Sequence, residues 1–160
     1  MKFYLKPLIA AIAIYTFMTP GASNAQQPTP VTIVHAKTIA ETCPGQWEHQ
    51  RCLQSLSYSN LALAGQYAEA LNKAGKKDAI ETLRQTCAAS TAATKGEYPP
   101  AAMTSAFTTC ANSIYSLSEE TGIKPDQSHY QLLIAAILCL NKDPQCELLE
   151  AGLKKGIGAQ

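Results

Sequence analysis

Six cysteines restrict the fold of this 160-residue chain more than any other feature, because each bond between two of them would fix two separate positions in space. They are Cys43, Cys52, Cys87, Cys110, Cys139 and Cys146. An even number of cysteines in an exported chain is typical of a disulfide framework. Many pairings are possible on paper, so the choice among them depends on where the turns lie.

The midpoint between Cys87 and Cys110 falls between Tyr98 and Pro99, inside the turn-forming residues 95–100. If the flanking segments form an antiparallel helical hairpin, the two thiols face each other at the same level. This spacing predicts a bond inside the hairpin, on the apolar side of both helices.

The same reasoning pairs Cys139 with Cys146, because their midpoint lies in the turn-forming residues 141–144. Cys43 and Cys52 then form the third pair, which ties the N-terminal segment to the first long helix. A free or metal-bound set is the alternative. It has little support, since the chain lacks a C-x-x-C motif, a haem signature and a cysteine–histidine pair at zinc spacing.

Residues 1–25 have the pattern of a secretory signal peptide. Lys2 and Lys6 make a basic start, and residues 8–18 form an apolar core that is too short to span a membrane. Small residues then precede Gln26, where we expect cleavage. An uncleaved anchor is the alternative.

The charge balance argues against two classes of partner. Thirteen basic and twelve acidic residues leave the chain almost neutral, so we expect neither nucleic acid nor an anionic membrane surface as a partner. No second long apolar stretch follows the signal, and we expect no integral membrane segment in the mature chain. We predict a soluble exported protein in a bacterial periplasm, where oxidising conditions keep disulfides formed.

Residues 26–42 are interpreted as an extended N-terminal arm. They contain Pro28, Pro30 and the β-branched run 31–34, but no second strand candidate is present to pair with that run. We expect the arm to lie along the helices or to be loose.

Helical periodicity begins after the arm. The first helix covers about residues 46–74, with a bend or break possible at residues 57–60, and Gly75 ends it. The second covers about residues 77–94 and ends at Gly96.

Three more helices are predicted after residue 98, with turns between them. The third begins at Pro99 and Pro100 and ends at Gly122. The fourth is capped by Asp126 or Ser128, and its residues Leu132, Leu133, Ile134, Ala135, Ala136, Ile137, Leu138, Cys139 and Leu140 are apolar on every side. The fifth opens with Asp143 as its cap and Pro144 as its first residue.

These patterns predict an all-α fold of four to five antiparallel helices in one small disulfide-reinforced bundle over residues 43–156. The fourth helix would be central because it lacks a polar face. The extended arm at residues 26–42 precedes the bundle, and a tail at residues 157–160 follows it.

No catalytic, cofactor-binding or metal-binding residues are predicted. His35, His49 and His129 are not spaced as metal ligands, and we expect surface or capping roles for them. Serine nucleophile motifs and phosphate-binding glycine loops are missing from the sequence. Thiol–disulfide exchange by Cys139 and Cys146 is the one catalytic alternative, because Cys146 lies near a helix N-terminus.

We therefore expect a non-catalytic exported protein that binds another protein. Trp47 and Tyr98 are the candidate interface residues, since Trp and Tyr are favoured anchors and Tyr98 lies in an exposed turn. Neutralising an envelope-targeting hydrolase as an immunity or inhibitor protein, or serving a secretion or conjugation system, would fit this compartment. A small-molecule carrier is a further alternative, and a homodimer is possible.

Overall fold

The computed structural model describes residues 30–158 and contains six α-helices and no strand in that range. The helices are α1 Pro30–Thr42, α2 Gln50–Lys73, α3 Lys77–Thr94, α4 Pro100–Thr121, α5 Gln127–Leu140 and α6 Cys146–Gly158. The all-α prediction is confirmed. The predicted signal peptide, residues 26–29 of the predicted arm and the last two residues of the tail lie outside the described residues.

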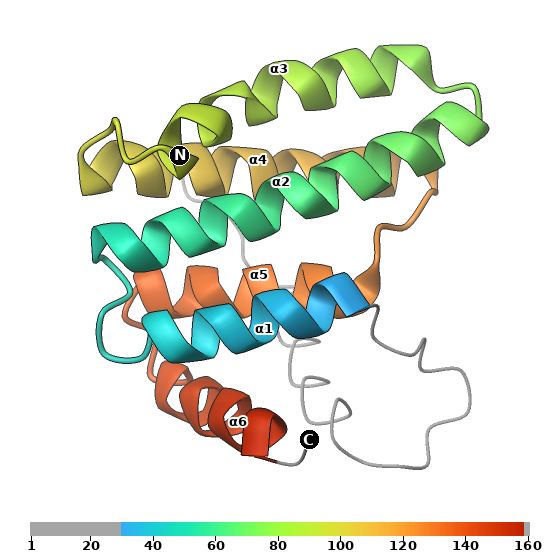
Figure 1. Cartoon of the computed structure of the whole chain (residues 1–160). Helices are drawn as coiled ribbons and strands as arrows, with labels where there is room; N and C mark the ends of the chain where they lie inside the picture. The colour runs from blue at the N-terminus through green and yellow to red at the C-terminus, as the bar shows by residue number, and fades with distance from the viewer. Residues whose placement is uncertain (1–29, 159–160) are drawn as a thin grey trace, which may run out of the picture.

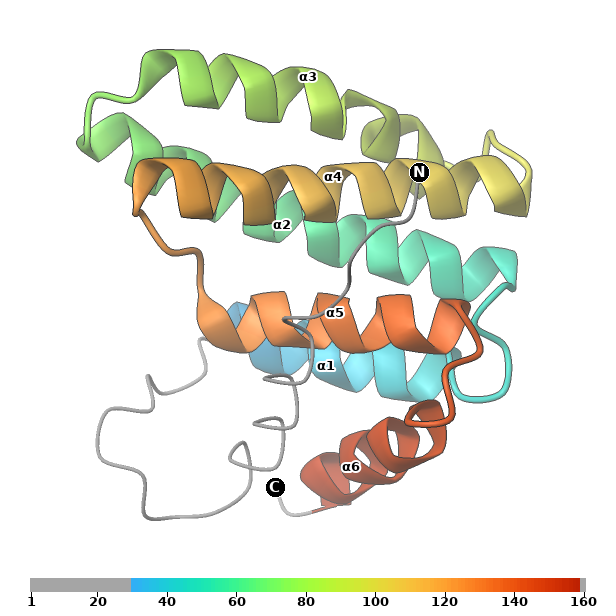
Figure 2. The same cartoon turned by 180° about the vertical axis from the view of Figure 1, so that it is seen from behind.

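Helices α2, α3 and α4 each pack against the other two and form a three-helix group, in which the main contacts of α3 are with α2 and α4. Helices α1 and α5 lie side by side below α2, and α6 packs against both of them (Figure 1). The view from behind shows α5 running along α4 and α6 crossing beneath (Figure 2). The core residues lie both among α2, α3 and α4 and between these helices and α1 and α5.

Two helices, rather than one, form the centre of the bundle. Helix α5 touches α1, α2, α4 and α6, as expected from its apolar composition, and α2 touches α1, α3, α4 and α5. Their fully buried side chains include Leu53, Leu56, Leu63, Tyr67 and Leu71 from α2 and Leu133 from α5. Among the described helices, none has both the length and the apolar character of a membrane crossing.

The prediction of an extended arm is wrong for residues 30–42, which form α1 and raise the helix count to six. Pro30 occupies the first helical position, where its missing N–H leaves no bond unmade. Ile39 and Cys43 are completely buried one turn apart, so packing on the bundle outweighs the weak helix propensity of the β-branched residues. The hydroxyl groups of Thr38 and Thr42 also bond back to carbonyls one turn earlier.

Helix α2 is continuous through residues 57–60, where a bend or break was considered. Ser57, Ser59 and Asn60 are buried there instead of capping a second helix. The Asn60 side-chain amide donates to the Phe107 carbonyl oxygen of α4 at 2.9 Å. This contact gives a poor helix former a place in the interior.

Several predicted helix boundaries are confirmed, whereas α2 begins at Gln50, four residues later than expected. Gly75 has φ +71°, and the amide of Lys76 bonds to the Leu71 carbonyl, which satisfies one of the last free acceptors of α2. The Asp126 carboxylate accepts the His129 N–H at 3.0 Å and so caps α5. Helix α6 begins at Cys146, two residues later than expected, and extends past Gly156 to Gly158.

Candidate functional site

Three disulfide bonds join the pairs that the cysteine spacing predicts, and they use all six cysteines. The Cα–Cα distances are 4.8 Å for Cys43–Cys52, 4.5 Å for Cys87–Cys110 and 4.8 Å for Cys139–Cys146, all within the range of a bridged pair. The first two bonds are buried, and Cys146 alone among the six is half-buried. Only the third bond therefore offers a sulfur atom near solvent.

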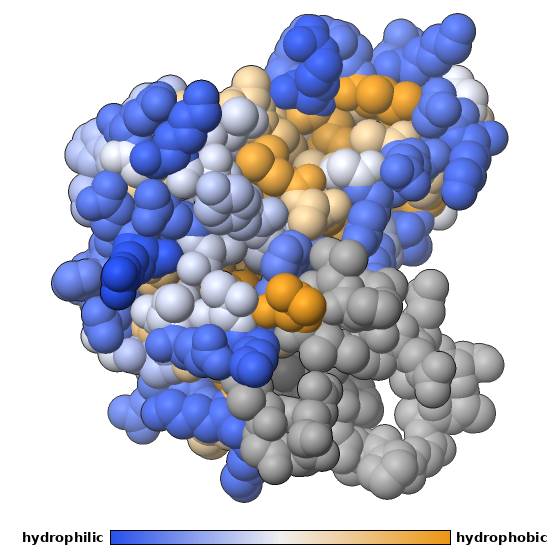
Figure 3. Space-filling model, in the orientation of Figure 1, coloured by the Kyte–Doolittle hydropathy of each residue, from blue (hydrophilic) through white to orange (hydrophobic). Residues whose placement is uncertain are grey.

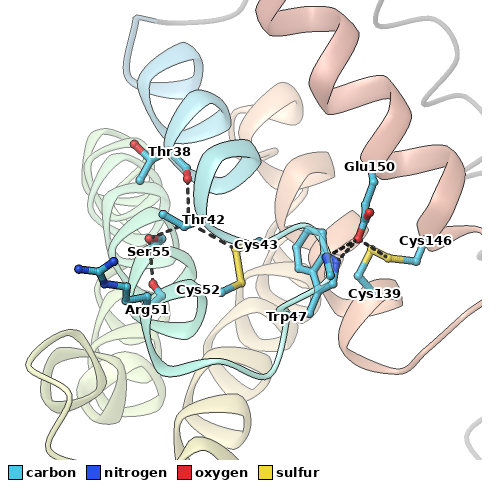
Figure 4. The surroundings of a disulfide bond; sticks show 11 residues. Thr38, Thr42, Cys43, Trp47, Arg51, Cys52, Ser55, Cys139, Cys146 and Glu150 are labelled. Carbon is cyan, nitrogen blue, oxygen red and sulfur yellow. Dashed lines mark hydrogen bonds between the residues drawn. A yellow bond between two sulfur atoms is a disulfide. The ribbon is translucent and has the colours of Figure 1, made fainter.

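Glu150 of α6 lies beside that third bond (Figure 4). One of its oxygens, Oε1, accepts the indole N–H of Trp47 at 2.7 Å and the backbone N–H of Gly45 at 3.0 Å. The same oxygen is 3.8 Å from Cys146 Sγ, which carries no proton because it is bridged. Glu150 therefore fastens α6 to the loop between α1 and α2.

The position of Glu150 disfavours the thiol–disulfide alternative. Exchange requires a thiolate to approach a bridge sulfur, and Cys146 Sγ is the accessible one. A carboxylate 3.8 Å from that atom repels an incoming thiolate and opposes a negative charge on Cys146 after reduction. The geometry is that of a bond that fastens α5 to α6.

Trp47 is placed differently from the prediction. Its side chain is 7% exposed and belongs to the core, so it cannot be an interface anchor in this conformation. Its pairing with Glu150 explains the burial, because an indole N–H needs an acceptor when it leaves water. Tyr98 is 38% exposed in the loop between α3 and α4, as expected, and its role in an interface stays a prediction.

A buried polar cluster forms where α1, α2 and α5 meet. Nε2 of His129 lies 3.1 Å from Nδ1 of His35 and 2.7 Å from the Ser59 hydroxyl oxygen. His129 is completely buried, and its Nδ1 contacts no hydrogen-bond partner in the described part of the chain. We name these three residues the histidine cluster.

The histidine cluster is uncharged at neutral pH. Burial, followed by the nearby His35, lowers the pKa of His129 to about 4, although Asp126 and Ser59 act in the opposite direction. Burial also lowers the pKa of His35. The expected surface or capping role is therefore wrong for His129, whereas His49 is exposed.

An uncharged surface with large apolar side chains lies along α1 and α2. Val34 is 60% exposed and Tyr58 is 57% exposed. The Thr42 and Ser55 hydroxyl oxygens are 3.3 Å apart, which sets the level of the two antiparallel helices. Two turns from that contact, Val34 on α1 and Ala62 on α2 reach the same level.

We define the α1–α2 face as Val34, Tyr58, Ala62 and Gly65. Tyr58, Ala62 and Gly65 follow one another at spacings of four and then three residues, so they share one side of α2. Figure 3 shows apolar residues gathered on this side of the molecule, over α2 and between α2 and α3. Residues 52–68 include no charged side chain, and exposed Lys37, Glu41, Arg51 and Glu69 flank the face.

Two open depressions lie elsewhere on the surface. One, of about 210 Å³, is lined by residues that include Tyr115, Glu119, Lys124 and Tyr130, with the two tyrosine rings nearly parallel at a centroid distance of 6.4 Å. The other, of about 330 Å³, lies at the start of α3 and is lined by both lysines and acids. Neither has the enclosed apolar shape that a small-molecule carrier needs.

In the described range, no three His, Cys, Asp or Glu side chains gather as a metal site would require. No protein-family model, curated protein or solved structure shows a significant match to this chain. The interpretation of function therefore depends on the chain's own residues.

The tertiary contacts described above have weak signals in the sequence. His35 and His129 are 94 residues apart, and Trp47 and Glu150 are 103 residues apart, so no local pattern links either pair. The uncharged run over residues 52–68 is the one signal that points toward the α1–α2 face.

Proposed function

We propose that this chain is exported to an oxidising compartment, a bacterial periplasm, and that it binds another protein there without catalysing a reaction. Three disulfide bonds in a chain with a signal-like N-terminus support the compartment. The described helices fit this proposal because none is of the membrane-crossing type.

The α1–α2 face is the observation that carries the proposal. An exposed tyrosine and an exposed valine lie beside small residues, and the charged residues lie around them rather than among them. Protein interfaces have this arrangement, in which apolar and aromatic side chains fill the centre and charges occupy the rim. Gly65 adds a flat position where a partner can approach the backbone, since no atom lies within 4 Å of an added Cβ.

The state of the reactive side chains supports the proposal of a non-catalytic role. All six thiols are bridged, which leaves no cysteine nucleophile. The most perturbed histidine, His129, is completely buried among helices and cannot reach a substrate. We propose the neutralisation of an envelope-targeting hydrolase, or service to a secretion or conjugation system, as the specific forms of this binding role.

Substitution of an exposed tyrosine by a charged residue tests the proposal. We expect Tyr58→Asp to reduce, by at least about ten-fold, the partner that copurifies with the tagged chain from an envelope extract, because a carboxylate cannot be buried cheaply in an apolar interface. Tyr115→Asp is the matched control, since Tyr115 is 44% exposed on α4, away from the face.

Both variants should keep the circular dichroism and melting temperature of the wild type. Equal recovery with wild type and Tyr58→Asp would contradict the proposed face. A loss of copurified partner in both variants would show that binding is not confined to the α1–α2 face. Recovery of a second copy of the chain would identify a homodimer as the partner.

A further inference from the structure

The two ends of α1 are held in different ways. Its C-terminal end is covalently fixed by Cys43–Cys52, and the Thr42 hydroxyl lies next to Ser55. Toward its N-terminus, the contact between His35 and His129 is the polar link from α1 to the rest of the described chain. The histidine cluster therefore adds a polar contact with α5 to the apolar packing of Ala36 and Ile39 that holds α1 on the bundle.

This link works only while the two rings are not both charged. A neutral imidazole has one N–H donor and one acceptor nitrogen, so Nδ1 of His35 and Nε2 of His129 can share one proton across 3.1 Å. When both rings are protonated, every ring nitrogen is a donor, and the two facing nitrogens repel each other. The Ser59 hydroxyl oxygen lies beside His129 Nε2 and can accept a hydrogen bond from that N–H, but it does not also accept one from His35.

The surroundings offer little to stabilise two positive charges. On α5, the Asp126 carboxylate lies at the helix start and is already used by the His129 backbone N–H. On α2, no charged residue occurs in residues 52–68. The remaining charged groups on the packed helices are exposed or committed elsewhere: Lys37 and Glu41 on α1, Arg51, Glu69 and Lys73 on α2, Glu119 and Glu120 on α4, and Glu147, Glu150, Lys154 and Lys155 on α6.

We propose that the histidine cluster is an acid-sensitive latch, in which protonation of both rings releases the N-terminal half of α1 from α2 and α5. The Cys43–Cys52 bond keeps the other end of α1 attached, so the release is confined to α1, and a helix of 13 residues that has left the bundle frays in water and exposes its amides. Because α1 supplies Val34 to the α1–α2 face, opening also divides that face. This last consequence alone rests on the proposed function.

The direction of the pH effect follows from proton linkage. The pKa of His129 is lowered from its ordinary 6.5 to about 4 in the closed state, so the open state binds more protons between these values. The closed state is therefore fully favoured above about pH 6.5 and loses stability as the pH falls toward 4. We expect the opening equilibrium of α1 to rise by about ten- to a hundred-fold over this range.

Hydrogen exchange followed residue by residue by NMR on the intact oxidised protein tests the latch. After correction for the intrinsic pH dependence of exchange, amides of residues 35–42 should lose protection between pH 6.5 and pH 4, while amides in the centre of α4 should keep theirs. His129→Phe should abolish this selective loss, because it fills the site without titrating. His49→Gln, at an exposed position, should behave like the wild type.

His35→Gln provides a second variant if His129→Phe does not fold, since His35 is only half-buried and its replacement leaves no buried hole. It should reduce the selective loss of protection without abolishing it, because the repulsion between the two rings is gone while burial still lowers the pKa of His129. Equal changes in amide protection in α1 and α4 at every pH would overturn the latch. So would a selective loss of protection in both folded variants that equals the loss in the wild type. None of these measurements involves a partner, so they stand whether or not the proposed function fails.

Discussion

Glu150 joins three parts of the chain through one carboxylate oxygen. It lies on α6, accepts hydrogen bonds from the Trp47 indole N–H and the Gly45 backbone N–H, and lies beside the Cys139–Cys146 bond. A buried indole N–H without an acceptor is unfavourable, so this oxygen is needed for Trp47 to enter the core. The single tryptophan thus reports on how α6 is docked.

We expect Glu150→Ala to destabilise the protein by about 1–3 kcal/mol, because it leaves the Trp47 N–H buried and unpaired. Glu150→Gln is the matched control, since its side-chain oxygen can still accept both bonds, and it should cost clearly less. Urea unfolding monitored by tryptophan fluorescence measures both values. A Glu150→Ala variant as stable as the Gln variant would show that the acceptor is not what holds Trp47.

Three polar residues are buried in the middle of α2, which continues through them. Ser57, Ser59 and Asn60 suggest a break in a helix when read locally, because their side chains compete for backbone bonds. In the structure they face the interior, where Asn60 and Ser59 find partners on α4 and α5. Such partners are contributed by distant helices and leave no trace in the local sequence.

Among the features of the helices, the turns between them are predicted best by the sequence. Gly75, Gly96 and Gly122 all have positive φ, and Pro100 begins α4, as their sequence contexts indicate. Because the turns were placed correctly, the cysteines on either side of them were paired correctly. Helix α1 was missed because its β-branched residues resemble a strand, and only packing against α2, α5 and α6 makes them helical.

The two hairpin bonds should contribute unequally to stability. In the chain-entropy treatment, Cys87–Cys110 closes a sequence separation of 23 and contributes about 3.4 kcal/mol, whereas Cys139–Cys146 closes a separation of 7 and contributes about 2.4 kcal/mol. Burial reinforces this order, because Cys87 and Cys110 both lie in the core. We therefore expect the larger loss when the first bond is removed.

Urea unfolding of the Cys87→Ala/Cys110→Ala and Cys139→Ala/Cys146→Ala double variants measures this order. The first pair should be less stable than the second by about 1 kcal/mol. A reversed order would show that docking of α6 through Cys139–Cys146 matters more to the fold than closure of the α3–α4 hairpin.

Over the whole molecule, helical periodicity and turn residues predict the class of fold, and tertiary contacts decide the candidate surface. The apolar spacing indicates an all-α chain, and the described residues are all-α. The choice of interface residues could not be made from residue type, because Trp47 and Tyr58 are both aromatic and differ only in what covers them. Trp47 is covered by α6 through Glu150, whereas the Tyr58 side chain stays largely exposed.

The distribution of charge gives the molecule two kinds of surface. Residues 52–68 of α2 and residues 99–118, which hold most of α4, are free of charged side chains, and the charges gather toward helix ends and on α6. Among the side chains whose exposure the structure describes, those of the α1–α2 face alone combine this lack of charge with apolar groups that are more than half exposed. We therefore place the proposed binding role on that face.

Site-specific photo-crosslinking in the living host tests this role most directly. A benzophenone amino acid at position 58 should give a discrete crosslinked product with a second protein, and the same group at position 112, an exposed site on α4, should give little or none. Wild-type chain in excess should compete the product away. No discrete product at position 58, or equal products at both positions, would contradict a partner bound on the α1–α2 face.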